Sequence, residues 1–580
     1  MQNSRRVFRR GAFRTWRIVG AMTLISLAGA TQAQTPTVSA VSGRPALLLG
    51  AFDLASLGYR SDEFFLSGTA SSYQVAATGT GTATVAGTAP FVTRFVVTRP
   101  IDPHKFNGTV LVEWDNVSGG QDVPTEWLMA HRELVRSGYV HVAVSVQKVG
   151  IDGGPAIAGG GTPLKRADPA RYGSLNHPGD AFAFDIFSQA GRVLRGANAS
   201  VVLGELTPQR IIAAGESQSA VFLTTYINDV DPLAKVFDGF LVHSRFGGAA
   251  PLTGASLMSQ NTSPPQPTPY RRNLRVPVLT VLTETDVLGS RLGGYYEARV
   301  PDSKQLRVWE IAGAAHADNY LFGLGMRDSG ALSTEDLVRG FTPTTQAAGG
   351  TLDKPANTGL AHHYVVQAAI ASLDRWLRTG TASPHGAALK VVDGNPPAYA
   401  RDANGLVEGG VRTPWVDVPT VRLSGSGNSG GPLAMLAGVA ESFDAATLDR
   451  LYPGGKQQFM TLFQHSLDAS IQAGFILPAD RGEILGVAAA SYGNAQVTVA
   501  PTDAPATAQH YTTAATPLGE LLDNDTTKAV LVKHVPDLVN NPQISMARGM
   551  TLKALQAYSP GLSDQTLAAI DTDLAKLPLP

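Results

Sequence analysis

The fold of this chain is decided by residues 210–219, which read RIIAAGESQS. The apolar run that ends at Ala214 is typical of a buried strand, and an apolar helical pattern begins a few residues later. Between them stands Gly215-Glu216-Ser217-Gln218-Ser219. A serine at a sharp strand-to-helix turn, with small residues two before and two after it, is typical of a nucleophile elbow. Ser217 is therefore the candidate nucleophile, and the backbone N–H of Gln218 is a candidate donor to an oxyanion.

On both sides of this turn, short apolar runs alternate with helical patterns, which indicates βαβ units and a mostly parallel sheet. The predicted strands cover 109–114, 140–146, 210–214, 240–242, 278–282 and 306–311. The predicted helices cover 127–135, 182–194, a stretch from 219 and 364–377. Earlier apolar runs at 64–66 and 91–97 predict antiparallel strands at one edge. We expect an α/β fold with a doubly wound, mostly parallel sheet, antiparallel N-terminal edge strands and a small helical C-terminal appendage.

A serine nucleophile in such a sheet is followed in the chain by an acid and then a histidine, each just beyond the C-terminal end of a strand. Asp286 and His316 satisfy this order, after the strands at 278–282 and 306–311. Glu284 is a second carboxylate at the same strand end and remains the alternative acid. The pattern predicts a Ser217–Asp286–His316 triad, in which the acid fixes the histidine tautomer and stabilises its imidazolium.

The second half of an oxyanion hole requires an N–H from the loop after an earlier strand. The glycine-containing loop that follows 109–114 predicts donors at the backbone of Asn116 and Val117. A formal Gly-x-Ser-x-Gly match also occurs at Ser429, but it stands among serines and glycines with no helix start, so we expect a loop there.

Other motifs predict neither a cofactor nor a metal site. Gly159-Gly160-Gly161 with Lys165 lacks the spacing of a phosphate loop, and residues 523–525 lack the glycine of a calcium loop and predict a helix cap. His362 and His363 are adjacent, so their side chains diverge, and we expect packing or capping roles for them, with a place in the pocket lining as the alternative for one of the two. The chain has no cysteine, which excludes a thiol nucleophile and disulfides.

Residues 1–33 have the pattern of an export signal: paired arginines at 5–6, an apolar run from 18 to 30 and a small-residue cleavage site. The arginine pair favours the twin-arginine export machinery, with an ordinary secretory signal as the alternative. Removal of this segment changes the charge from 46 basic against 47 acidic residues to 40 against 47. We expect a mildly acidic, periplasmic or secreted protein that binds no nucleic acid and has no stable membrane insertion.

The expected domains are a main α/β body at 34–486, a linker rich in small residues at 487–516 and a helical segment at 517–580. Within the body, the accessory region at about 387–480 mixes short strands, glycine-rich turns and one helical stretch.

The chain resembles the α/β-hydrolase superfamily, and within it a bacterial group labelled alpha/beta hydrolase domain proteins. The resembling stretches lie at 108–117, 177–180, 185–191, 215–219, 284–287, 313–318 and 410–414, within residues 45–480. Ser219 replaces a glycine that many hydrolases have at the end of the elbow.

The resemblance implies an esterase-like hydrolase without an agreed substrate. We expect an exported serine hydrolase that cleaves carboxylic esters, small or polymeric, through an acyl-enzyme. The alternatives are an amidase or peptidase, a thioesterase or an acyltransferase on the same fold, and an inactive binding protein.

Overall fold

The computed structural model describes residues 36–75, 83–157, 161–255, 266–289, 293–347, 350–431, 433–493, 511–514, 516–540, 551–556 and 562–577. The predicted export signal lies outside these residues, as do Gly159, Gly160 and most of the predicted linker.

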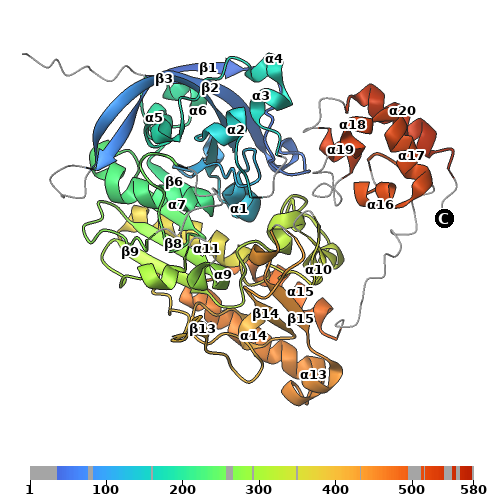
Figure 1. Ribbon diagram of the computed structural model, residues 1–580. Helices are drawn as coiled ribbons and strands as arrows, with labels where there is room; N and C mark the ends of the chain where they lie inside the picture. The colour runs from blue at the N-terminus through green and yellow to red at the C-terminus, as the bar shows by residue number, and fades with distance from the viewer. Residues whose placement is uncertain are drawn as a thin grey trace, which may run out of the picture. The chain divides into compact units, whose positions relative to one another are not determined.

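A single large sheet organises the main body of the protein (Figure 1). Among the described residues, nine strands form this sheet in the order β1-β2-β3-β5-β4-β6-β7-β8-β9. Their bounds are β1 (Thr37–Val41), β2 (Tyr59–Val75), β3 (Ala83–Pro100), β4 (Thr109–Trp114), β5 (Val140–Val144), β6 (Arg210–Glu216), β7 (Gly239–His243), β8 (Val278–Thr283) and β9 (Leu306–Ile311). The pairs that involve β1, β2 and β3 are antiparallel, and the others are parallel. The expected fold class is confirmed.

Helices cover both faces of the sheet because its central strands are apolar on both sides. In β4, Leu111 packs with α1 (Thr125–Arg136) and α11 (His363–Thr379), whereas Val110 and Val112 pack with α5 (Ala183–Val193), α6 (Ala199–Leu203) and α7 (Gln218–Thr225). Successive side chains of a strand point to opposite faces, so an unbroken apolar run reports a strand buried on both sides. The two hydrophobic cores that result hold the carboxyl ends of the parallel strands in register.

An aromatic cluster anchors the end of β4 beside the candidate elbow. The ring of Trp114 lies 5.9 Å from Phe184, 5.1 Å from Phe187 and 5.4 Å from Phe222, measured between centroids. Phe184 and Phe187 belong to α5, and Phe222 belongs to α7, the helix that follows the elbow. Tilted and edge-to-face rings add to the free energy of simple apolar burial. The cluster therefore fixes α7 against the strand that precedes the second candidate oxyanion loop.

Shorter helical elements connect these main elements. The α-helices are α2 (Lys148–Asp152), α3 (Leu164–Ala167), α4 (Pro169–Tyr172), α8 (Asp231–Ala234), α9 (Glu284–Leu288) and α10 (Thr334–Phe341). The 3-10 turns are η1 (Ala55–Leu57), η2 (Pro103–Lys105), η3 (Asp180–Phe182), η5 (Tyr295–Ala298), η7 (Ala434–Leu436) and η8 (Pro478–Asp480), and the π-helical turns are η4 (Tyr226–Val230) and η6 (Tyr320–Leu324). A two-stranded ribbon joins β10 (Gln346–Ala347) to β11 (Gly350–Thr351).

The accessory region holds more helix than its sequence predicts. Its ribbons are β12 (Val391–Val392) with β13 (Ala398–Tyr399), and β14 (Val421–Ser424) with β15 (Val439–Ser442). Its helices are α12 (Pro414–Asp417), α13 (Ala445–Leu451) and α14 (Gly455–Ala473), where one helical stretch is predicted. The next helix, α15 (Arg481–Ser491), continues past residue 487, so the first residues of the predicted linker are helical. Their small side chains, mostly alanine, suit a helix as well as a linker.

The C-terminal segment is helical, as predicted. Its helices are α16 (Leu518–Asp523), α17 (Asp525–His534), α18 (Pro536–Val539), α19 (Leu552–Leu555) and α20 (Asp564–Leu574). The Asn524 side chain caps α17, which is the role that the sequence predicts for residues 523–525, and the Ser563 side chain caps α20. None of the helices in the described ranges is long and apolar enough to cross a membrane.

Candidate active site

Ser217 stands at a strained turn between β6 and α7. Its backbone adopts φ 57° and ψ −119°, a region that a non-glycine residue seldom occupies, and its N–H donates to the carbonyl of His243 at 2.9 Å. A Cβ atom placed on Gly215 would lie 3.2 Å from the backbone carbonyl carbon of Ser219. The tight approach explains why small residues flank the serine, and the turn lifts the Ser217 hydroxyl clear of the sheet.

The structure brings Ser217, His316 and Asp286 together at the carboxyl edge of the sheet. The Ser217 Oγ lies 2.7 Å from the His316 Nε2, and the His316 Nδ1 lies 2.6 Å from the Asp286 Oδ1. The three side chains follow β6, β9 and β8, and parallel strands place their carboxyl ends at one edge. Ser217 is 7% exposed, His316 3% and Asp286 0%, so little water competes for these contacts.

Of the two candidate acids, only Asp286 contacts His316. Its Oδ2 accepts from the backbone N–H of Thr283 at 2.7 Å and from the Thr283 hydroxyl at 2.8 Å, which leaves Oδ1 aimed at the histidine. The Glu284 carboxylate instead accepts from the backbone N–H groups of Gly313 at 2.7 Å and Gly425 at 2.9 Å. Glu284 therefore holds the loop that carries His316, and Asp286 holds the imidazole itself.

The charges of the pair favour a basic histidine. Burial alone would lower the pKa of His316, but the Asp286 carboxylate, followed by Glu216, outweighs burial and raises this pKa above its ordinary value. Burial would raise the pKa of Asp286, but His316 and the Thr283 donors lower it. Asp286 is therefore ionised at neutral pH, and the Nδ1 proton of His316 points toward it. The Nε2 lone pair is then free to accept the Ser217 proton.

Two of the three backbone donors predicted for the oxyanion are available. Within the described residues, the N–H groups of Gln218 and Val117 donate no backbone hydrogen bond. The prediction of a donor at the Asn116 backbone is wrong, because this N–H donates to the carbonyl of Val123 at 2.9 Å. Asn116 instead uses its side-chain amide to bind Glu216, at 2.9 Å from Oε2 and 3.2 Å from the backbone oxygen. The side chain of Asn116 thus joins the loop of Val117 to the elbow.

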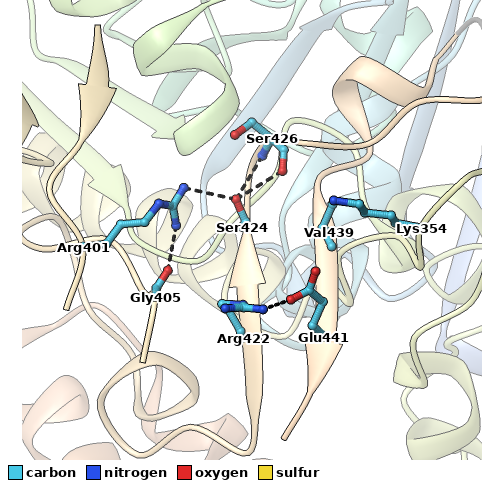
Figure 2. Close-up of a pocket in the computed structure, with 8 residues that line it drawn as sticks. All are labelled: Lys354, Arg401, Gly405, Arg422, Ser424, Ser426, Val439 and Glu441. Carbon is cyan, nitrogen blue, oxygen red and sulfur yellow. Dashed lines mark hydrogen bonds and ion pairs between the residues drawn. The ribbon is translucent and has the colours of Figure 1, made fainter. Parts of the chain in front are cut away.

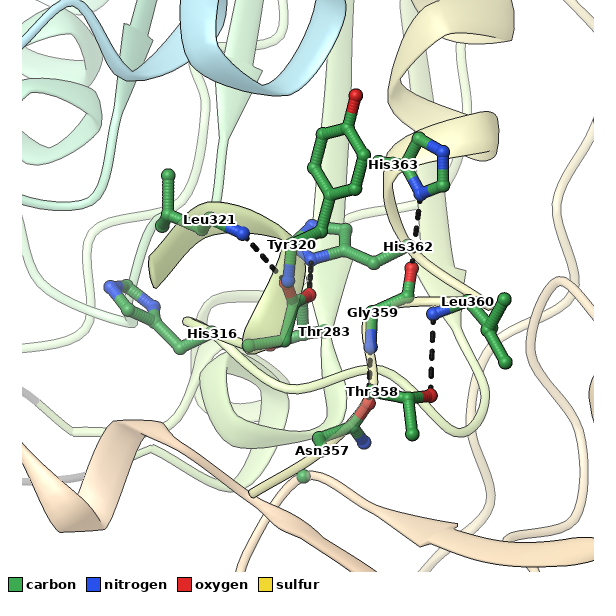
Figure 3. Close-up of polar contacts among 12 residues, drawn as sticks. Thr283, His316, Tyr320, Leu321, Asn357, Thr358, Gly359, Leu360, His362 and His363 are labelled. Carbon is green, nitrogen blue, oxygen red and sulfur yellow. Dashed lines mark hydrogen bonds and ion pairs between the residues drawn. The ribbon is translucent and has the colours of Figure 1, made fainter. Parts of the chain in front are cut away.

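Four buried titratable residues near the triad are not among the site candidates that the sequence predicts: Glu126, Glu216, His243 and Asp318. The His362 Nδ1 contacts the Asp318 Oδ2 at 2.8 Å, and the His243 Nδ1 contacts the Glu126 Oε1 at 3.2 Å. His362 and His363 diverge as predicted, and Figure 3 shows the His363 ring bound to the carbonyl of Gly359. A signal was available for Glu216 and His243, since each stands at the carboxyl end of a predicted strand.

The remaining sequence candidates lie away from the triad and have ordinary partners. Ser429 is in an exposed loop and donates to Asp353 at 2.6 Å, as expected for a loop serine. Lys165 forms an ion pair with Asp152 at 2.7 Å. In the part of the chain that the structure describes, no group of three or more histidine, aspartate or glutamate residues is arranged to hold a metal ion.

A surface pocket of about 240 Å³ lies beside the β14–β15 ribbon (Figure 2). Its lining residues are Lys354, Arg401, Gly405, Arg422, Ser424, Ser426, Val439 and Glu441. Gly425, between two of these residues, donates to Glu284, so one wall of the pocket is continuous with the loop contacts that support His316.

A family model described as "Alpha/beta hydrolase domain" matches residues 28–486. Among solved structures, a protein described as a dienelactone hydrolase from Klebsiella pneumoniae is 13% identical, with a TM-score of 0.26, over 46% of this chain and 93% of its own. A thermostable esterase from Pseudomonas putida is 12% identical, with a TM-score of 0.23, over 41% of this chain and 68% of its own. A comparison with curated proteins found no match.

Proposed function

Because the chain belongs to the alpha/beta hydrolase domain family, we propose that it is an exported serine hydrolase that cleaves carboxylic esters through an acyl-enzyme. The observation that carries the proposal is the unbroken series of contacts from Ser217 Oγ to His316 Nε2 at 2.7 Å and from His316 Nδ1 to Asp286 at 2.6 Å. These distances are within the reach that a nucleophile, its general base and the group that orients the base require.

Acylation begins when Ser217 Oγ attacks the carbonyl carbon of the ester. As the Oγ–C bond forms, the serine proton passes to His316 Nε2 and the carbonyl electron pair moves onto its oxygen. The N–H groups of Gln218 and Val117 are the donors available for this oxyanion. When the tetrahedral intermediate collapses, the C–O bond to the alcohol breaks, and His316 gives its proton to the departing alkoxide.

Deacylation repeats these steps with water as the nucleophile. His316 takes a proton from the water as it attacks the acyl carbon, and returns that proton to Ser217 Oγ as the acid leaves. Asp286 keeps the imidazole in one tautomer throughout and stabilises its cationic form. The reaction needs no cofactor. The flat contact of Phe246 with the His316 ring, at 5.1 Å between centroids, also holds the imidazole in place.

Covalent labelling tests the mechanism directly. A fluorophosphonate probe is expected to label the wild-type protein and Ser429→Ala at equal rates, and to leave Ser217→Ala unlabelled. The Ser429 variant is the matched control, because Ser429 satisfies the formal motif but lies in an exposed loop. Full labelling of Ser217→Ala contradicts the assignment of the nucleophile.

A substrate panel separates the esterase from its alternatives. The proposal expects turnover of p-nitrophenyl esters, with anilides and thioesters of the same acyl group turned over more slowly. Faster anilide cleavage identifies an amidase or peptidase, and transfer to an added alcohol identifies an acyltransferase. A protein that labels at Ser217 but turns over none of these substrates is a binding protein.

Export is supported by the charged, apolar and small-residue segments of residues 1–33. We expect the twin-arginine export machinery to be its partner and the periplasm or the exterior to be its location. The test is the N-terminal sequence of the protein recovered outside the cytoplasm, which is expected near Gln34. Substitution of Arg5 and Arg6 by lysine is expected to block recovery if the twin-arginine route is used, and to leave it intact if the ordinary secretory route is used.

A further inference from the structure

Glu216 contacts the opposite side of the triad histidine from Asp286. Its Oε1 lies 3.4 Å from His316 Nε2, the nitrogen that also faces Ser217 Oγ. Asp286 contacts Nδ1 of the same ring. The imidazole therefore lies between two carboxylates, one near each nitrogen, and the Glu216 side chain is 4% exposed.

Glu216 is held in this position from a separate loop. The Asn116 side-chain amide donates both to Oε2 of Glu216 and to its backbone oxygen. Asn116 is itself fixed, because its Oδ1 accepts from the N–H of Ser118 at 2.8 Å and its backbone pairs in both directions with Val123. With Oε2 bound in this way, Oε1 stays toward His316.

A buried cation lies next to Glu216 on the neighbouring strand. His243 is the register partner of Glu216, and its Nε2 lies 2.8 Å from His362 Nε2. Since His362 presents its Nδ1 to the Asp318 carboxylate, its Nε2 is the acceptor and His243 Nε2 is the donor. The other nitrogen of His243 faces the Glu126 carboxylate. His243 thus donates from Nε2 to His362 and faces the Glu126 carboxylate with Nδ1, and these two contacts stabilise its doubly protonated form.

Charged groups of several neighbouring elements act on Glu216, and one of them, the Glu113 carboxylate, belongs to the adjacent strand β4. His316 and His243 favour its ionised form, whereas burial, Glu126 and Asp286 oppose it. Burial is the largest effect and raises the pKa of Glu216 to about 7. The carboxylate is therefore ionised in the alkaline half of the physiological range, where an esterase with a histidine base works.

We propose that Glu216 is a second positioning carboxylate, which stabilises the His316 imidazolium from its Nε2 side while Asp286 stabilises it from the Nδ1 side. When the Ser217 proton reaches Nε2 and Oγ bonds to the acyl carbon, the new N–H lies between the reacting oxygens and Glu216 Oε1. The ion pair lasts until the proton passes to the alkoxide. This inference rests on the serine mechanism proposed above.

The test is the pH profile of kcat/KM for a p-nitrophenyl ester with wild type, Glu216→Gln and Glu216→Asp. Loss of the carboxylate removes a stabilising charge from the imidazolium, so His316 loses its proton at lower pH. The acid limb of Glu216→Gln is expected to move down by about one pH unit, and kcat on the alkaline plateau to fall about three- to tenfold. Glu216→Asp keeps the charge and is expected to return the acid limb toward its wild-type position.

Glu284→Gln is the matched control, because Glu284 is equally buried and its pKa is also raised to about 7, yet it contacts the Gly313 and Gly425 N–H groups and not His316. Its acid limb is expected to stay in place. Asn116→Ala is a further variant, which leaves Glu216 unchanged but frees its carboxylate, and is expected to move the limb in the same direction as Glu216→Gln by a smaller amount. Thermal unfolding shows whether Glu216→Gln folds, and if it does not, the Asn116→Ala variant provides the test.

An unmoved acid limb in folded Glu216→Gln overturns the inference, as does an equal movement in Glu284→Gln. Failure of the underlying mechanism is recognised separately, because it appears as fluorophosphonate labelling of Ser217→Ala. If Ser217→Ala is unlabelled and Glu216→Gln keeps the wild-type pH profile, the serine mechanism stands and only the proposed role of Glu216 is contradicted.

Discussion

His243 and His362 meet through their Nε2 atoms at 2.8 Å, although 119 residues separate them in the chain. One of two imidazole nitrogens in such a contact must donate and the other must accept. Burial would lower the pKa of His243, but Glu126, followed by Glu216 and Asp286, raises it to about 9. Burial lowers the pKa of His362, which is therefore the neutral acceptor. At neutral pH the pair therefore carries one positive charge, on His243, the register partner of Glu216.

This charge predicts a pH-dependent stability. The pKa of His243 is raised from 6.5 to about 9 on folding, so its stabilising effect is complete below pH 6.5 and is lost as the pH rises through 9. The loss is on the order of 3 kcal/mol, because each pKa unit corresponds to about 1.4 kcal/mol. Urea unfolding of wild type and His243→Gln from pH 6 to 9.5 measures it. The two free energies of unfolding are expected to converge at high pH, and parallel curves contradict the assignment.

The two acids after β8 are expected to differ sharply when each is replaced. Asp286→Asn removes the carboxylate at His316 Nδ1, and kcat is expected to fall about 10³- to 10⁴-fold without loss of folding. Glu284→Gln keeps one acceptor for the Gly313 and Gly425 N–H groups and leaves the other unpaired, so a stability loss of about 1–3 kcal/mol is expected. Ester kinetics and thermal unfolding of both variants separate the two roles. A larger loss of kcat in Glu284→Gln reverses the assignment.

The open N–H of Val117 is expected to bind the oxyanion. Val117→Pro removes the donor and is expected to lower kcat about 10²- to 10³-fold with a smaller change in KM. Val117→Ala keeps the N–H and removes only the branched side chain, so its kcat is expected to stay near that of the wild type. Steady-state kinetics on one p-nitrophenyl ester, with thermal unfolding to check the proline variant, decide the question. Equal kcat in the folded proline and alanine variants excludes Val117 as the donor.

The close approach of Gly215 and Ser219 predicts a pair of coupled substitutions. Gly215→Ala places a Cβ 3.2 Å from the Ser219 carbonyl carbon and 3.3 Å from its Cβ, so a loss of about 1–3 kcal/mol of stability is expected. Ser219→Gly removes one of these contacts and is expected to recover part of the loss in the double variant. Unfolding free energies of the four proteins form a double-mutant cycle that measures the coupling. If the two changes in unfolding free energy are strictly additive, Gly215 and Ser219 have no steric interaction.

The sequence by itself determined the sheet, the elbow and the order of the triad members. Strand runs such as Ile211 to Ala214 are buried on both faces and form unbroken apolar segments, and the elbow depends on residues that are neighbours in the chain. The antiparallel edge pair is visible as the apolar runs at 64–66 and 91–97, although β2 and β3 extend well beyond these runs at both ends. These features depend on residues that are close together in the chain, so a short stretch of sequence is enough to predict them.

Only the tertiary structure decided which polar groups meet. Asp286 and Glu284 are two residues apart on the short helix α9, where about 100° of rotation per residue points one to His316 and the other to Gly313 and Gly425. The contact of the Asn116 side chain with Glu216 and the contact between His243 and His362 join residues that are 100 and 119 positions apart, so they depend on how distant loops and strand ends pack at the sheet edge. Sheet register and loop packing are collective properties of the folded chain, and no local pattern encodes them.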